Sequence, residues 1–125
     1  SLYFIFPEAS TMGETLPFKG NWMQSFILEF ILTFILMFVI LNVSTGSKEK
    51  GITAALAVGG VVAFEATFAG PISGASMNPA RSIAPAFFAG ELTHLWLYVT
   101  ATILGAILAV YSCNLVQDEE CCDNC

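Results

Sequence analysis

The composition of this 125-residue chain is typical of a membrane protein. Hydrophobic residues make up 56% of the chain and charged residues only 11%, whereas an ordinary soluble domain carries about 25% charged residues. The formal net charge is −6, and the four Lys and Arg residues form no basic patch for nucleic acid or another polyanion. These values exclude an ordinary soluble domain and disfavour a nucleic-acid partner.

The N-terminal segment 1–21 is expected to hold the end of a preceding span followed by an extracellular loop, because Pro7, Gly13 and Pro17 punctuate it. The chain opens with Ser1 rather than Met and carries no cleavable signal. We therefore expect the sequence to be a fragment whose upstream part is missing.

Residues 22–43 form the first complete predicted span, since 22 largely apolar residues are enough to cross a bilayer. Glu29 lies inside this span, and a carboxylate within a membrane is costly unless it faces a partner in the protein interior. We expect the backbone amides of the loop at 70–82 to be that partner. A hydrogen bond that only joins two packed helices is the alternative.

Two further spans are predicted at 52–69 and 91–116, and each carries small residues at every fourth position, which permits close helix contact. These residues are Ala55, Gly59 and Ala63 in the first of the two, and Ala101, Gly105, Ala109 and Cys113 in the second. Trp96 and Tyr98 lie near the outer end of the last span, where they predict an interfacial aromatic belt. For Glu65 an interfacial position, a bond to the loop and a place beside a conduit all remain open.

Two segments are expected in the cytoplasm. The polar segment 44–51 holds two of the four basic residues, which the positive-inside tendency places there. The tail 117–125 would lie on the same side, because two further spans separate it from this segment. Its Cys122 and Cys125 have C-x-x-C spacing, for which we favour reduced thiols over acylation or a metal half-site.

The segment 70–90, which begins Gly-Pro-Ile-Ser-Gly-Ala-Ser-Met-Asn-Pro-Ala-Arg-Ser, places polar, irregular backbone between two spans. Unpaired backbone groups cost several kcal/mol in hydrocarbon, so such a segment survives only when it is buried in protein or lines a watery cavity. The sequence therefore predicts a pore lining here. A tight loop with a surface helix is the alternative.

A short helix is predicted to start in this segment, since Asn78 is a favourable N-cap and Pro79 suits the first helical position. From Pro79 to Phe88 the helix would extend about 15 Å, half of a hydrocarbon core of about 30 Å. It would enter the membrane without crossing it. Its positive N-terminus and the charge of Arg81 would then repel cations near the bilayer centre.

No catalytic constellation is recognisable, since the chain has a single His, no glycine-rich phosphate loop and no metal-ligand cluster. An enzyme, a cofactor and a metal are therefore not expected.

The run from Ser73 to Ser82 resembles the second signature loop of the aquaporin, or major intrinsic protein, family. Its lead-in Gly70-Pro71 resembles the nodulin-like branch and its bacterial relatives, and the stretches 13–17, 29–34 and 95–98 match family patterns in the same order. The resemblance implies an all-α membrane protein with three transmembrane helices and one re-entrant half-helix. Residues 1–125 would then be the C-terminal half of one inverted-repeat channel domain.

This resemblance implies a passive channel for water and small neutral solutes that excludes ions and protons. It also implies a missing N-terminal half of the same chain, a homotetramer, and a multi-pass location in a plasma or inner membrane with the C-terminus in the cytoplasm. The residues that it assigns to the pore are Ala66, Gly74, Ala75, Asn78, Pro79, Ala80 and Arg81, with Glu29 bracing the loop.

The family pattern gives two opposing signals about the solute. Ala66 and Ala75 are small at positions of the constriction, which favours glycerol-sized solutes, while Ser82 and Ala86 lack the acidic and basic pair of dedicated glycerol channels. A water-only aquaporin is the alternative within the family. Outside it, a proton-coupled carrier using Glu29 and Glu65, or a non-conducting membrane scaffold, remains open.

Overall fold

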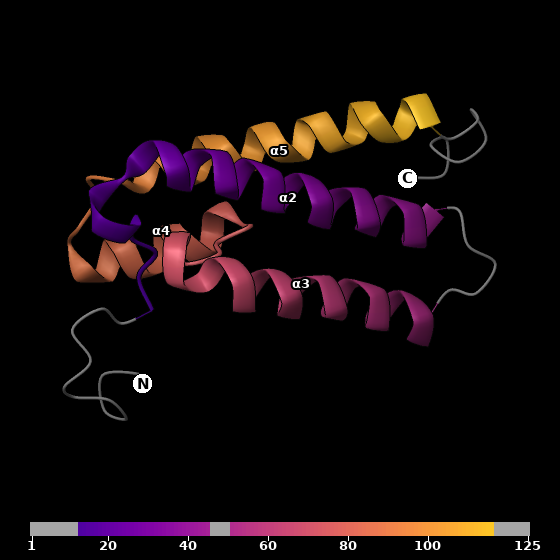
Figure 1. The fold of residues 1–125 in the computed structure, drawn as a ribbon, viewed down its shortest axis with the longest axis horizontal. Helices are drawn as coiled ribbons and strands as arrows, with labels where there is room; N and C mark the ends of the chain where they lie inside the picture. The colour runs from indigo at the N-terminus through magenta and orange to yellow at the C-terminus, as the bar shows by residue number, and fades with distance from the viewer. Residues whose placement is uncertain (1–12, 46–50, 117–125) are drawn as a thin grey trace.

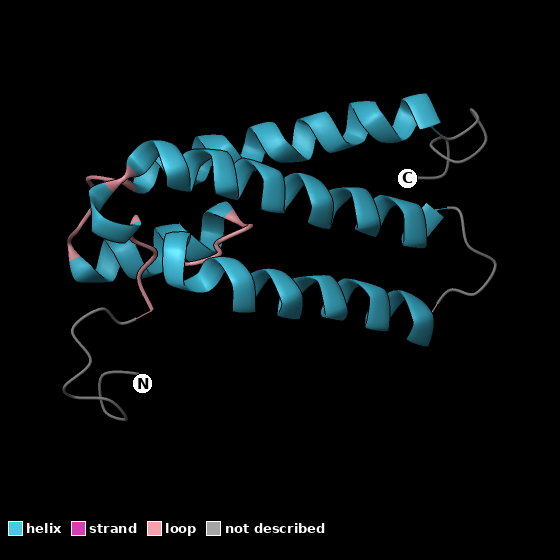
Figure 2. Cartoon of the chain, viewed as in Figure 1, coloured by secondary structure: helices cyan, strands magenta, loops and turns pink. Residues whose placement is uncertain are grey.

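The computed structural model describes residues 13–45 and 51–116, and in these ranges it contains helices and loops but no strand (Figure 2). A short 3-10 turn, η1 (Phe18–Gly20), precedes α2 (Trp22–Thr45), and α3 (Ile52–Ser73), α4 (Pro79–Ala89) and α5 (Leu95–Val116) follow. The predicted all-α class is confirmed. The predicted cytoplasmic tail with its cysteines lies outside the described residues.

Three helices in the described ranges are long and apolar enough to cross a membrane, at Trp22–Ser44, Ile52–Ser73 and Leu95–Val116. The second of them continues past Ala69, where the sequence placed the end of the span, and includes Pro71. The helix ends at Ser73, and the C-cap Gly74 adopts a left-handed conformation in which its N–H donates to the Gly70 carbonyl at 3.0 Å. The loop that follows is correspondingly shorter.

The long helices form a layer in which α2 lies between α5 and α3, with α3 antiparallel to the other two (Figure 1). The short α4 lies at one end of this layer and packs against α5. The closest approach is between α2 and α5, where a Cβ atom on Gly105 would lie 2.4 Å from the Phe30 carbonyl oxygen. The predicted small-residue face of α5 is buried there, which confirms its packing role.

The small residues of α3 behave differently, because Ala55, Gly59 and Ala63 are all exposed. Within the described part of the chain no helix covers this face, so the expected close contact stays a prediction. Instead, α3 turns another side, which includes Gly60 and Glu65, toward α2. Small residues permit a close approach, but the helix must also face a partner on that side.

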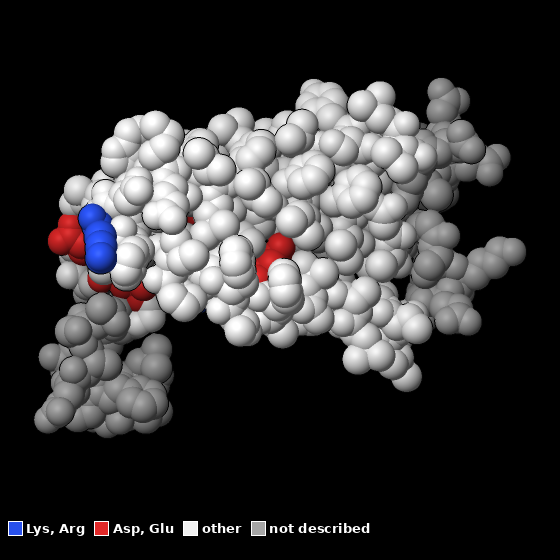
Figure 3. Space-filling model, in the orientation of Figure 1, with Lys and Arg blue, Asp and Glu red and all other residues white. Residues whose placement is uncertain are grey.

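Large apolar side chains cover the outer faces of the long helices, as in Ile31, Phe64 and Leu108, which are exposed by 44%, 72% and 44%. On the face shown in Figure 3, the charged atoms gather at one end of the molecule, and the flanks are uncharged except for one acidic area. A helix that is apolar on all sides belongs in lipid or in contact with further apolar helices.

Candidate functional site: the loop between α3 and α4

The start of α4 has the geometry that the sequence predicts. Asn78 is the N-cap, with extended backbone, and its Oδ1 accepts a hydrogen bond from the Ala80 N–H at 2.9 Å. Pro79 occupies the first helical position, where its missing N–H has no cost. At 11 residues, α4 is about 16 Å long, roughly half of the hydrocarbon thickness.

The loop before α4 holds two non-glycine residues in the left-handed region, Ala75 at φ 44° and Met77 at φ 53°. Such conformations cost about 1–3 kcal/mol each and persist only where the surroundings impose them. Ala75 is buried in a small apolar cluster with Leu32 and Ala69, and Met77 packs against that cluster. Packing from α2 and α3 therefore holds one side of the strained loop.

The Glu29 carboxylate holds the loop through three hydrogen bonds. Its Oε1 accepts from the Ser73 hydroxyl at 2.6 Å and from the Ser76 N–H at 2.9 Å, and its Oε2 accepts from the Met77 N–H at 2.9 Å. Glu29 is fully buried, so these bonds replace the hydration that a carboxylate requires. The contact that we predicted between Glu29 and the loop amides is present.

Ser73 and Tyr98 extend this network and were missed from the sequence. The Ser73 hydroxyl accepts a bond from the Ala75 N–H at 3.2 Å, and the Tyr98 hydroxyl donates to the Ser73 carbonyl at 2.7 Å. Tyr98 is 1% exposed, so its expected place in an aromatic belt is wrong, whereas Trp96 is half exposed and lies near the rings of Trp22 and Phe26. The sequence pattern does not distinguish the buried Tyr98 from the exposed Trp96, because both lie in the same apolar run.

A second network involves hydroxyl groups on the other side of the loop, which the sequence also did not reveal. The Ser82 hydroxyl lies 2.7 Å from that of Thr15 and 2.6 Å from that of Ser76. The Ser76 hydroxyl donates to the Asn78 carbonyl at 2.8 Å. The segment at 13–17 is thereby tied to the start of α4.

A cavity of about 590 Å³ lies beside the loop and is bounded by α2, α3 and α5. Five of the seven predicted pore residues line it: Ala66, Ala75, Asn78, Pro79 and Arg81. The other two do not. Gly74 packs instead against Thr15, and Ala80 contributes its N–H to the cap on Asn78. The remaining lining residues include Thr33, Leu36, Met37, Ile40, Val62, Ser76, Met77, Thr102, Ile103 and Ala106.

The polar groups of this cavity suit a neutral solute. Because Oδ1 of Asn78 is engaged in the cap, the amide nitrogen is the part of that side chain left to donate to a solute. The Arg81 side chain is exposed, and the N-terminus of α4 adds a partial positive charge. Among the lining residues, all within the described ranges, none is acidic. This charge distribution disfavours cations.

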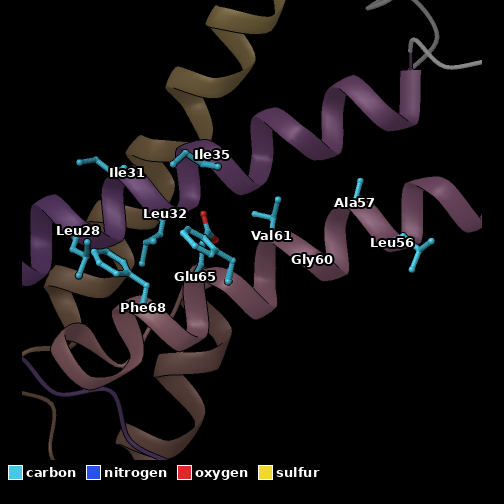
Figure 4. A pocket seen from close by; sticks show the side chains of 11 residues that line it. Leu28, Ile31, Leu32, Ile35, Leu56, Ala57, Gly60, Val61, Glu65 and Phe68 are labelled. Carbon is cyan, nitrogen blue, oxygen red and sulfur yellow. The ribbon is translucent and has the colours of Figure 1, made fainter.

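Glu65 lies elsewhere, in an apolar groove of about 500 Å³ between α2 and α3. Figure 4 shows it extending from α3 toward α2 among leucine, isoleucine and phenylalanine side chains. It is 2% exposed, and in the described part of the chain neither carboxylate oxygen has a hydrogen-bond partner. This environment does not fit an interfacial position or a bond to the loop, and a place beside the conduit stays a prediction.

No group of three or more His, Cys, Asp or Glu residues that could hold a metal occurs within the described residues. The cavity itself offers amide, guanidinium and hydroxyl groups on apolar walls. Such a lining orients a hydrogen-bonding solute, and it has no paired nucleophile and base.

Comparison with known proteins places the chain in a family. Residues 2–112 match the family model of the major intrinsic protein. The chain is 47% identical over 103 residues to aquaporin NIP1-1 of maize (Zea mays), a match that covers 82% of this chain and 36% of the relative. It is 44% identical over 103 residues to nodulin-26 of soybean (Glycine max), with 82% and 38% covered.

A third relative, aquaporin NIP3-1 of Arabidopsis thaliana, is 44% identical over 93 residues, which cover 74% of this chain and 29% of the relative. The chain thus spans about a third of the length of the curated relatives that it matches. With three candidate spans, a half-helix that starts at an Asn-Pro-Ala motif and a family match over nearly its whole length, the chain belongs to the major intrinsic protein, or aquaporin, family.

Proposed function

We propose that this chain forms one half of a passive channel through which water and small neutral solutes cross a lipid bilayer. The observation that carries the proposal is the cavity beside the α3–α4 loop, where Asn78, Arg81 and the start of α4 converge. A neutral solute would accept a hydrogen bond from the Asn78 amide. The positive end of α4 and Arg81 would exclude cations and protons, as in the general account of aquaporin-type selectivity.

The remaining half of the conduit would come from an N-terminal half of the same chain. Two observations support this: the relatives are more than twice as long as the chain, and the small-residue face of α3 is exposed. In inverted-repeat transporters two similar halves meet at the bilayer midplane. We further propose a homotetramer in a plasma or inner membrane, with the 44–51 segment and the C-terminus in the cytoplasm.

The roles of the individual residues follow from their contacts. Asn78 would bind the solute, Arg81 would form the charge barrier, and Ala66 and Ala75 would set the width of the constriction. Glu29 would support the loop without touching the solute, since its carboxylate already accepts three hydrogen bonds.

The small side chains of Ala66 and Ala75 favour a constriction that passes glycerol or urea as well as water. Two relatives carry the name aquaporin and one the name nodulin-26, and a water-only channel is the alternative.

Stopped-flow light scattering on proteoliposomes of the full-length protein distinguishes the wide constriction from the water-only channel. We expect glycerol flux above that of empty liposomes, and a larger loss of glycerol than of water flux in Ala66→His. Glycerol flux equal to that of empty liposomes would contradict the wide constriction.

Two other functions predict different results in the same liposomes. A proton-coupled carrier would require Glu29 and Glu65 to act together, but the first is occupied by the loop and the second faces a separate groove. Uptake that depends on a pH gradient would favour the carrier. A non-conducting scaffold would leave osmotic swelling at the rate of the lipid alone. We expect swelling above that rate and no effect of the gradient.

A further inference from the structure

Thr15, in the segment that precedes η1, contacts the signature loop at two points. Its hydroxyl lies 2.7 Å from that of Ser82, and a Cβ atom on Gly74 would lie 3.0 Å from its Cα and Cγ2 atoms. Thr15 is only 6% exposed. We propose that Thr15 is a positioning residue that fixes the width of the conduit from outside the loop. This inference rests on the proposed channel function.

The proton positions in the hydroxyl network follow from the acceptor at its end. A carbonyl oxygen only accepts, so the Ser76 hydroxyl must use its single proton on the Asn78 carbonyl. The bond between Ser76 and Ser82 then requires Ser82 to donate. Since the Ser82 proton is used, Thr15 must donate to Ser82. The direction of all three hydrogen bonds is thereby set, with Thr15 as the first donor.

The network ends on backbone that positions the conduit. The Asn78 carbonyl also accepts the Arg81 N–H at 3.2 Å, so one oxygen joins the hydroxyl chain to the first turn of α4. Hydrogen bonds that donate in one direction polarise and strengthen one another. Removing the Thr15 proton therefore weakens the contact between Ser76 and Asn78 at the far end of the chain.

Thr15 and Glu29 hold the loop in different ways. Glu29 binds Ser73, Ser76 and Met77 from α2, whereas Thr15 acts from the 13–17 segment through Ser82 on α4. The loop also leaves no space at Gly74, whose φ of +86° and contact with Thr15 both disfavour a larger residue. Loss of the Thr15 bond would let the start of α4 move while Glu29 keeps the loop folded.

The test compares Thr15→Val with Thr15→Ser in full-length protein reconstituted in liposomes. Valine keeps the shape and removes the donor, so we expect the ratio of glycerol to water permeability to rise by roughly two- to tenfold, the factor that the net free energy of one hydrogen bond represents. Serine should restore the parent ratio. Thr100→Val is the matched control, because the Thr100 hydroxyl is exposed and bonds within its own helix.

An unchanged ratio in folded Thr15→Val, or an equal loss of both fluxes, would overturn the positioning role. If the parent protein conducts nothing above empty liposomes, the channel function fails, and the hydroxyl chain is then judged by thermal melting. We expect the Thr15→Val, Ser82→Ala double variant to have the melting temperature of the less stable single variant, since both substitutions interrupt the same series of hydrogen bonds. Additive losses would overturn the proposal. If Thr15→Val does not fold, the flux measurement uses Ser82→Ala instead, because this variant removes the acceptor of the same hydrogen bond.

Discussion

The two buried glutamates of this chain show how differently the same residue is accommodated within one membrane fold. Glu29 on α2 is fully buried and accepts three hydrogen bonds from the signature loop. Glu65 on α3 is 2% exposed and lies in an apolar groove, with no partner for either oxygen in the described ranges. Burial alone therefore does not identify a stabilising carboxylate, and the groups around it decide its contribution.

The largest expected effect is that of Glu29→Gln. The amide keeps the shape but presents an NH₂ donor where the loop also presents donors, so at least one buried N–H or O–H loses its acceptor. We expect the free energy of unfolding to fall by roughly 2–4 kcal/mol. Thermal melting of the full-length protein in detergent measures this, with Glu65→Gln as the matched control. Equal losses in the two variants would contradict the comparison.

Glu65→Leu should act in the opposite direction. The change removes an unpartnered buried carboxylate and places an apolar side chain among Leu32, Val61 and Phe68. We expect the protein to become more stable by about 1–3 kcal/mol. Glu91→Leu, at an exposed position, controls for a general effect of lost negative charge. A loss of stability as large as that of Glu29→Gln would show that Glu65 has a partner in the full-length protein.

Tyr98→Phe tests the outer part of the Glu29 network. The variant removes the donor to the Ser73 carbonyl but keeps the buried ring, so we expect a loss of about 1 kcal/mol. Tyr111→Phe is the control, because Tyr111 is 66% exposed. If both variants have the melting temperature of the parent protein, the Tyr98 hydrogen bond does not support the loop. A loss as large as that of Glu29→Gln would place the main support on Tyr98 instead.

The smallest effect concerns Glu14, outside the spans. Partial burial, and then the negative charge of Glu91, raise the pKa of the Glu14 carboxyl above its ordinary value. The folded state then binds the proton more tightly than the unfolded state, so stability falls as the pH rises from about 4. Glu14→Gln should flatten this decline in melting temperature, most clearly at low salt. A decline of the same steepness in the variant would exclude Glu14 as its cause.

The sequence by itself determined the features that depend on neighbouring residues. Long apolar runs set the three spans, because their length alone matches the bilayer. Asn78 and Pro79 set the start of α4, because capping is a local geometry. The partner of Glu29 was also predicted, since an intramembrane carboxylate needs donors and the family resemblance implies a glutamate that braces the loop.

Only the tertiary structure decided which of the two predicted small-residue faces is packed, because that of α5 is buried and that of α3 is exposed. The spans are apolar on nearly all sides, so their periodicity does not distinguish a packed face from an exposed one. For this reason Tyr98 proved to be buried, the small residues of α3 proved to be exposed, and Glu65 lies in a groove that no local pattern indicates. The bond from Thr15 to Ser82 joins residues 67 positions apart, and only the packing of the loop against the 13–17 segment brings them together.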